Sequence, residues 1–166
     1  TGTHETTRLC IEFIENYVKD GDKVLDIGCG SGILSIASLL LGAGHADAVD
    51  IDPNAVDIAY TNAGMNGIGK DVYTVVSGNI LLDEELDKQY SGKKYDVVEA
   101  NIVADVIIAL TKKIPEYIKK GGIFISSGII VERLDDVLDA LKNAGFEALE
   151  VNRDKGWAAI ASKYNN

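Results

Sequence analysis

The sequence has few cysteines and histidines and no long apolar run, so it lacks the residues for a disulfide framework, a zinc site or a membrane-spanning helix. The 166 residues include 2 cysteines, Cys10 and Cys29, and 2 histidines, with no CxxC pair and no Cys/His cluster. This scarcity excludes a disulfide scaffold, argues against a metal site and fits a reducing compartment, so we expect a cytoplasmic protein. No apolar run approaches the roughly 20 residues of a membrane-spanning helix, and no signal peptide is visible, so we expect no membrane partner.

Positive charge is also scarce. The chain has 16 Lys and Arg against 26 Asp and Glu, which gives a formal net charge of −10. An acidic surface argues against broad affinity for nucleic-acid backbones, so we expect no direct nucleic-acid partner. The acidity is compatible with a basic protein substrate, or with solubility alone. Because the chain starts at Thr1 rather than Met, inside a motif, we expect it to be one domain of a longer protein.

Apolar periodicity alternates between strand and helix patterns along most of the chain. We expect one α/β domain built on a doubly wound, mostly parallel, seven-stranded sheet. The last two strands have no helix between them and predict an antiparallel hairpin at the sheet edge. Residues 83–94 are interpreted as a polar loop, and Pro115 should mark a break or a new start in a helical segment. The predicted strands are residues 23–27, 45–51, 72–77, 95–101, 122–128, 146–153 and 157–164, and the predicted helices are 6–18, 32–41, 53–66, 103–119 and 131–145.

Glycine is concentrated directly after the first predicted strand, in VLDIGCGSG. Three glycines at alternate positions, from Gly28 through Gly30 to Gly32, let the backbone approach a ligand closely along the whole turn. A triphosphate loop would need GxxxxGK[ST], which follows no strand here. A dinucleotide fingerprint would need a third glycine at position 33, where Ile33 stands. The turn therefore indicates a nucleotide-like ligand without the usual pyrophosphate fingerprint.

An acidic pair ends the second predicted strand. Asp50 lies 22 residues after Gly28 (50 − 28), near the roughly 20 expected for a carboxylate that binds ribose hydroxyls. Asp52 precedes Pro53, so Asp52 is predicted to cap the next helix, with Pro53 at the first helical position.

These strings resemble known families. VLDIGCGSGILSIA followed by AVDIDPNAV is similar to the class I methyltransferases that use S-adenosylmethionine, with their Rossmann-like fold. TGTHETT at the start, ANIVADVI after the fourth strand, SGI after the fifth and GWAAIASK near the end resemble the ribosomal protein L-eleven methyltransferase family. Glu5 stands where the family usually has proline. The resemblance covers essentially the whole chain but only the catalytic half of the family enzyme, whose substrate-recognition domain precedes this region.

The resemblance implies S-adenosylmethionine as cofactor and places its contacts at Thr7, Gly28, Asp50 and Asn101. Gly30 belongs to the same turn and is included in the predicted site. Asn79 follows the third strand, where many class I methyltransferases bind adenine; it is expected to bind the exocyclic amine or to have only a loop role. A helix-capping role for Thr7 and a turn-forming role for Asn101 remain open. Cys29 is interpreted as a small residue in a crowded turn rather than a nucleophile.

The implied reaction is N-methylation, for which no metal is needed because the sulfonium of the cofactor is already electrophilic. A lysine, with a pKa of about 10.4, must lose a proton before it attacks. The sequence identifies no residue as the base; Asp105 and His4 are candidates only because they lie near the predicted site in the sequence. The family's planar-amine relatives carry NPPY after the fourth strand, whereas this chain has NIVA, which favours an aliphatic amine oriented by the carbonyl of Asn101.

The expected function is methylation of lysine or α-amino groups of a ribosomal protein of the large subunit. The alternatives are a methyltransferase for another protein or a small molecule, a nicotinamide-dependent oxidoreductase, and a domain that binds S-adenosylmethionine without catalysis.

Overall fold

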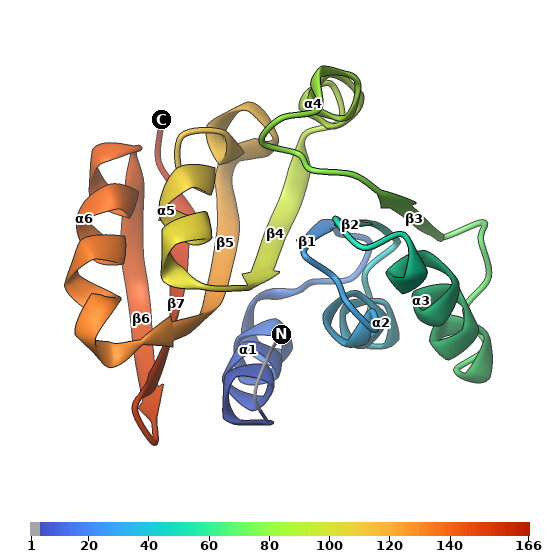
Figure 1. Ribbon diagram of the computed structural model, residues 1–166, viewed down its shortest axis with the longest axis horizontal. Helices are drawn as coiled ribbons and strands as arrows, with labels where there is room; N and C mark the ends of the chain where they lie inside the picture. Colours follow the sequence, from blue (N-terminus) through green and yellow to red (C-terminus); the bar gives the residue numbers. More distant parts are fainter. Residues whose placement is uncertain (1–3) are drawn as a thin grey trace.

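The computed structural model describes residues 4–166; residues 1–3, which begin the TGTHETT string, lie outside this part. A seven-stranded sheet forms the centre of the protein, in the order β3-β2-β1-β4-β5-β7-β6 (Figure 1). Strands β1 to β5 are parallel, and β7 runs antiparallel to both β5 and β6. The mostly parallel sheet and the antiparallel hairpin are therefore confirmed, with β6 as the outer edge. The strands are β1 Lys23–Ile27, β2 His45–Asp50, β3 Tyr73–Ser77, β4 Tyr95–Asn101, β5 Ile118–Ile130, β6 Phe146–Asp154 and β7 Trp157–Tyr164.

Helices cover both faces of this sheet. One apolar cluster packs α1, α2 and α3 on one face, and a second packs α4, α5 and α6 on the other. Neighbouring residues of β1 divide between them, because Val24 enters the first cluster and Leu25 the second. Burial on both faces explains why the central strands are apolar almost throughout. The helices are α1 His4–Tyr17, α2 Ile33–Leu40, α3 Asn54–Met65, α4 Glu84–Ser91, α5 Ala104–Leu110 and α6 Leu134–Asn143.

Two predicted segments were wrong. Residues 83–94 were expected to form a polar loop, but they contain α4, whose first turn is capped by the Asp83 carboxylate accepting from the backbone N–H groups of Glu85 and Leu86. Only Leu86 and Tyr90 of α4 are buried. Two apolar residues among many charged ones are too few to show the periodicity of a helix in the sequence. The helix predicted at 103–119 ends at Leu110, and β5 already begins at Ile118. Between them lies a short 3-10 turn, Ile114–Glu116, which contains Pro115, so the break or new start expected at Pro115 is confirmed.

The carboxyl ends of the parallel strands meet at one edge of the sheet. The glycine turn follows β1, Asp50 ends β2 and Asn101 ends β4. Because β1 leads to α2 on one face and β4 leads to α5 on the other, a crevice opens between these two strands. The residues predicted to bind the ligand are therefore gathered at one edge.

The amino-terminal helix α1 packs on the same face as α2 and is joined to the β6–β7 hairpin. Arg8 forms an ion pair with Asp154, and the Tyr17 hydroxyl donates a hydrogen bond to Glu150. Within residues 4–166, no helix is both long enough and apolar enough to cross a bilayer.

Candidate functional site

The turn between β1 and α2 is held in a conformation that favours glycine. Gly28, Gly30 and Gly32 all have positive φ, at 76°, 52° and 84°. The backbone N–H groups of Gly28 and Cys29 both donate to the carbonyl of Val49, at 2.8 and 3.1 Å, which fixes the turn against the end of β2. A Cβ atom on Gly28 would lie 2.7 Å from Cγ2 of Ile102, so the chain after β4 also packs against this turn.

The structure brings Asp50 to the glycine turn. Its Oδ2 accepts from the N–H of Gly30 at 2.8 Å, and its Oδ1 accepts from the N–H of Asp52 at 2.9 Å. A carboxylate has about four acceptor positions, so two remain for a ligand hydroxyl. Asp52 accepts from the N–H of Asn54, the first residue of α3, at 2.9 Å, from a position one residue before the N-cap. Pro53, however, occupies the N-cap position of α3, one residue before the first helical position predicted for it.

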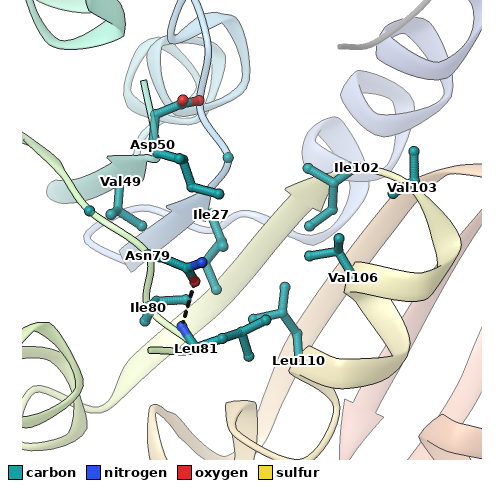
Figure 2. Close-up of a pocket in the computed structure, with 13 residues that line it drawn as sticks. Ile27, Val49, Asp50, Asn79, Ile80, Leu81, Ile102, Val103, Val106 and Leu110 are labelled. Carbon is teal, nitrogen blue, oxygen red and sulfur yellow. Dashed lines mark hydrogen bonds between the residues drawn. The ribbon is translucent and has the colours of Figure 1, made fainter. Parts of the chain in front are cut away.

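An apolar cavity of about 180 Å³ opens beside Asp50 (Figure 2). We call it the apolar cavity. Its walls come from the ends of β1 and β2, the loop after β3, the two residues before α5 and α5 itself, and they are almost entirely aliphatic. This shape suits a flat apolar ring, with the Asp50 carboxylate available to hydroxyl groups at one end. The lining residues are Ile27, Gly28, Val49, Asp50, Ile51, Gly78, Asn79, Ile80, Leu81, Ile102, Val103, Val106 and Leu110.

Asn79 is the amide side chain in the wall of the apolar cavity. Its Oδ1 accepts from the N–H of Leu81 at 3.0 Å, which stabilises the turn after β3 (Figure 2). Both roles considered for Asn79, turn formation and contact with a ligand, are therefore compatible with its place. The aliphatic residues around it were not predicted as site residues, because in the sequence they look like ordinary strand and helix interior.

A second cavity, of about 260 Å³, continues from Gly28 on the other side. We call it the polar cavity. Thr7 and Asn101, which are 94 positions apart in the chain, meet here, with Nδ2 of Asn101 donating to Oγ1 of Thr7 at 3.4 Å. Asn101 is 8% exposed, and its Oδ1 has no hydrogen-bond partner. A buried acceptor without a partner carries a free-energy cost that a donor on a ligand would remove. The cavity is lined by Thr7, Gly28, Cys29, Gly30, Ser31, Ile33, Leu34 and Asn101.

The two candidate bases lie apart from both cavities. His4 is exposed at the start of α1. Asp105 is also exposed and forms an ion pair with Nη1 of Arg133 at 2.8 Å. Cys29 lines the polar cavity, but burial raises the pKa of its thiol far above the ordinary value, so it is a poor nucleophile.

Two buried acids beneath the glycine turn were not predicted. Asp26 of β1 and Glu99 of β4 are register partners on neighbouring strands, and both are fully buried. Asp26 accepts from the N–H of Ser35 at 3.1 Å, and Glu99 accepts from the hydroxyl of Ser38 at 2.9 Å. Burial raises the pKa of Asp26 to about 7 and raises that of Glu99 well above its ordinary value. Nothing in the sequence marks the pair, because the register between β1 and β4 is a property of the fold.

These raised pKa values predict an unusual pH dependence of stability. Above the ordinary carboxyl pKa of 4.5, unfolding releases a proton from Glu99, so the free energy of unfolding should fall as the pH rises toward about 7. Glu99→Gln keeps the shape without the ionisation, so it should increase the free energy of unfolding by about 1–3 kcal/mol at about pH 8 and change it little at about pH 4. Denaturant titrations across this pH range measure both values. The exposed Glu15→Gln is the matched control, and an identical pH profile for all three proteins would contradict the prediction.

No group of three or more His, Cys, Asp or Glu side chains within residues 4–166 is arranged to hold a metal ion.

The structure gathers all six predicted site residues around two cavities that meet at Gly28. These residues are Thr7, Gly28, Gly30, Asp50, Asn79 and Asn101.

Comparison with known proteins identifies the family. The model for "Ribosomal protein L11 methyltransferase (PrmA)" matches residues 1–165. The chain belongs to this family. A ribosomal protein L11 methyltransferase from Lachnospira eligens is 46% identical over 164 residues, which cover 98% of this chain and 52% of the relative. The chain spans about half the length of the curated relatives it matches.

Solved structures agree with this assignment. The ribosomal protein L11 methylase from Lactobacillus delbrueckii subsp. bulgaricus has a TM-score of 0.89 and 30% identity, covering 100% of this chain and 81% of that one. An RNA methyltransferase from Salinibacter ruber, in complex with S-adenosyl-L-homocysteine, has a TM-score of 0.73 and 16% identity, covering 100% and 94%. At this lower identity the second likeness concerns the fold alone. The seven-stranded Rossmann-like methyltransferase fold expected from the resemblance is confirmed.

Proposed function

We propose that this chain is the catalytic part of an S-adenosylmethionine-dependent N-methyltransferase. Its substrate is ribosomal protein L11, and its targets are lysine or α-amino groups. The family membership supports the substrate. The observation that carries the proposal is the meeting of the two cavities at Gly28, with Asp50 in the wall of one and Asn101, whose buried Oδ1 has no hydrogen-bond partner, in the wall of the other. A ribosomal substrate would place this activity in the cytoplasm.

Five of the six predicted residues are assigned to the cofactor as follows. The apolar cavity takes the adenosine, with Asn79 beside the base and Asp50 accepting from the ribose hydroxyls. Gly28 and Gly30 let the backbone lie close to the methionine portion, because neither position carries a side chain. Thr7 reaches the polar cavity from α1. This arrangement gives the cofactor an extended path along the carboxyl edge of the sheet.

Asn101 orients the target amine in this proposal. When bound, S-adenosylmethionine supplies a methyl group on a positively charged sulfur. Oδ1 of Asn101 accepts an N–H of the neutral amine, which directs the nitrogen lone pair toward the methyl carbon. The buried surroundings also lower the pKa of an amine that enters the polar cavity, which favours the neutral, reactive form. His4 and Asp105 stay outside both cavities, so we assign neither of them as the base.

The residues after Asn101 favour an aliphatic amine. Ile102 and Val103, which follow Asn101 directly, are aliphatic and offer no aromatic face to a target group held at Asn101 (Figure 2). A planar base or amide would gain stacking energy from such a face, whereas a lysine side chain has no ring to stack. This supports lysine or α-amine methylation over methylation of a nucleobase.

Replacing Asn101 tests the role of this residue. Asn101→Ala should lower kcat by about 100-fold, the scale of a misaligned reacting group, while the Kd for S-adenosylhomocysteine changes by less than about tenfold. The assay measures methyl transfer to purified L11 by a protein of the full length of the relatives, with calorimetry for the cofactor product. Asn165→Ala, at the exposed end of the chain, is the matched control. A normal kcat with weakened cofactor binding would make Asn101 a cofactor ligand only.

The same calorimetry separates the remaining alternatives. Binding of S-adenosylhomocysteine without binding of NAD rejects the oxidoreductase. Binding without methyl transfer by any form of the protein would favour the non-catalytic domain, and transfer to amines other than those of L11 would favour another substrate.

A further inference from the structure

Thr7 and Asn101 come from different elements, so their meeting in the polar cavity must be arranged by other contacts. Their own hydrogen bond is long, at 3.4 Å, and cannot fix the two side chains by itself. Thr7 belongs to the first turns of α1, and Asn101 is the last residue of β4. Strand β5 lies beside β4 and under α1, where it can contact both.

Ser127 of β5 joins the two elements. It is the register partner of Asn101, and its backbone carbonyl accepts from the N–H of Ile102 at 3.1 Å. Its side-chain hydroxyl donates to the backbone carbonyl of Thr6 at 2.8 Å, in a fully buried position. One residue therefore binds the neighbour of Asn101 with its backbone and the neighbour of Thr7 with its side chain.

Gly128, the next residue, brings β5 still closer to Asn101. Its φ is 83°, and a Cβ atom there would lie 2.7 Å from the carbonyl oxygen of Ile102 and 3.0 Å from Oδ1 of Asn101. The space beside the unpartnered oxygen is thus bounded by the bare backbone of Gly128. Any shift of this backbone would move the acceptor or narrow the space in front of it.

We propose that Ser127 is a positioning residue for methyl transfer, holding α1 and the end of β4 at the spacing that keeps the Asn101 side chain in the wall of the polar cavity beside Thr7. This rests on the proposed role of Asn101. The hydroxyl acts through the backbone of Thr6 and never contacts the amine. Losing it should therefore lower kcat more than it weakens the binding of the cofactor or of the protein substrate.

The chain offers two matched controls. Ser162 is fully buried on β7 and donates to the carbonyl of Phe124 at 3.2 Å, so it makes the same kind of bond away from both cavities. Ser126 adjoins Ser127, is fully buried, and has a hydroxyl without a partner. Ser127→Ala should lower kcat by about tenfold or more, with KM for L11 and Kd for S-adenosylhomocysteine within about threefold of the unmutated protein. Ser162→Ala should give a comparable loss in Tm with kcat unchanged, and Ser126→Ala should change neither.

A double mutant then separates this proposal from the proposed function. If Ser127 acts through Asn101, Ser127→Ala combined with Asn101→Ala should be no slower than Asn101→Ala alone. If the kcat losses of the two single mutants multiply in the double mutant, the positioning role is overturned and the methyltransferase proposal stays intact. Equal kcat values for Ser127→Ala and Ser162→Ala would have the same consequence. Absence of methyl transfer by the unmutated full-length protein would instead refute the proposed function.

If Ser127→Ala fails to fold, Gly128→Ala provides a second test. Gly121, also in β5, has a φ of 82° and no atom closer than 4.0 Å to an added Cβ, so Gly121→Ala shares the backbone strain without the contacts. A kcat at least about tenfold lower for Gly128→Ala than for Gly121→Ala supports the proposal that the end of β5 positions Asn101. Equal kcat values would overturn it.

Discussion

Replacing Gly28 with alanine should reduce the affinity for S-adenosylhomocysteine by at least about 100-fold while the protein remains folded. Two effects act together. A positive φ of 76° costs an alanine about 1–2 kcal/mol, and the new methyl group would lie 2.7 Å from Cγ2 of Ile102. Ile102 lines the apolar cavity, so relieving this contact moves its side chain into the space proposed for the adenosine. Calorimetric titration with S-adenosylhomocysteine measures the loss.

Gly67→Ala is the control for this prediction. Gly67 has a φ of 74°, and an added Cβ would meet no atom within 4 Å, so the variant shares the backbone strain alone. Its Tm should fall by no more than that of Gly28→Ala, and its Kd should stay unchanged. Adding Ile102→Ala to Gly28→Ala then separates the two sources of lost affinity. If the double mutant regains affinity for S-adenosylhomocysteine, the displaced Ile102 side chain caused the loss. If it does not, direct contact between position 28 and the cofactor caused it. Unchanged affinity in Gly28→Ala would remove Gly28 from the site.

The positions of the polar residues at the strand ends could be predicted, because parallel strands carry their carboxyl ends to one edge of the sheet. Gly28 and Asp50 could therefore be placed together from spacing alone, and the hydrogen bond from Gly30 to Asp50 joins the same two segments. Thr7 and Asn101 are different. They lie 94 positions apart, and only the family resemblance linked them before the structure brought them to 3.4 Å.

What could not be predicted depends on packing between elements. In the sequence, Ser127 looks like one of several small polar residues in an apolar strand. Its hydroxyl can donate to the carbonyl of Thr6 only because α1 packs against β5. The proximity of Asp26 and Glu99 follows from the register of β1 against β4, which no local pattern encodes. Helix α4 was missed because just two residues, Leu86 and Tyr90, make up its buried side. Local sequence patterns thus predicted most helices and strands and the sheet edge that carries the site. The contacts that position the site residues depend on how the helices and strands pack together.

The largest functional effect should appear when this chain is compared with a protein of the full length of its relatives. The 166 residues contain all six proposed site residues, from Thr7 to Asn101, so S-adenosylhomocysteine should bind both proteins with the same Kd. Methylation of folded L11 should be at least about 100-fold slower with the chain alone. A standard protein–protein interface takes about 800 Å² from each partner, and the family resemblance assigns much of that area to the other half. A tethered recognition domain also raises the effective concentration of the target amine to about the millimolar range.

Tritiated-methyl transfer to purified L11 at equal enzyme concentrations measures this difference. A short lysine peptide serves as the matched acceptor, because it presents the amine without the folded surface that a recognition domain would bind. Both proteins should methylate the peptide at the same slow rate, since its reaction depends on the polar cavity alone. Equal rates on folded L11 would place recognition within these 166 residues, and the division of labour between two halves would have to be abandoned. A chain that methylates neither acceptor while binding the cofactor normally would show that the other half also completes the site around Asn101.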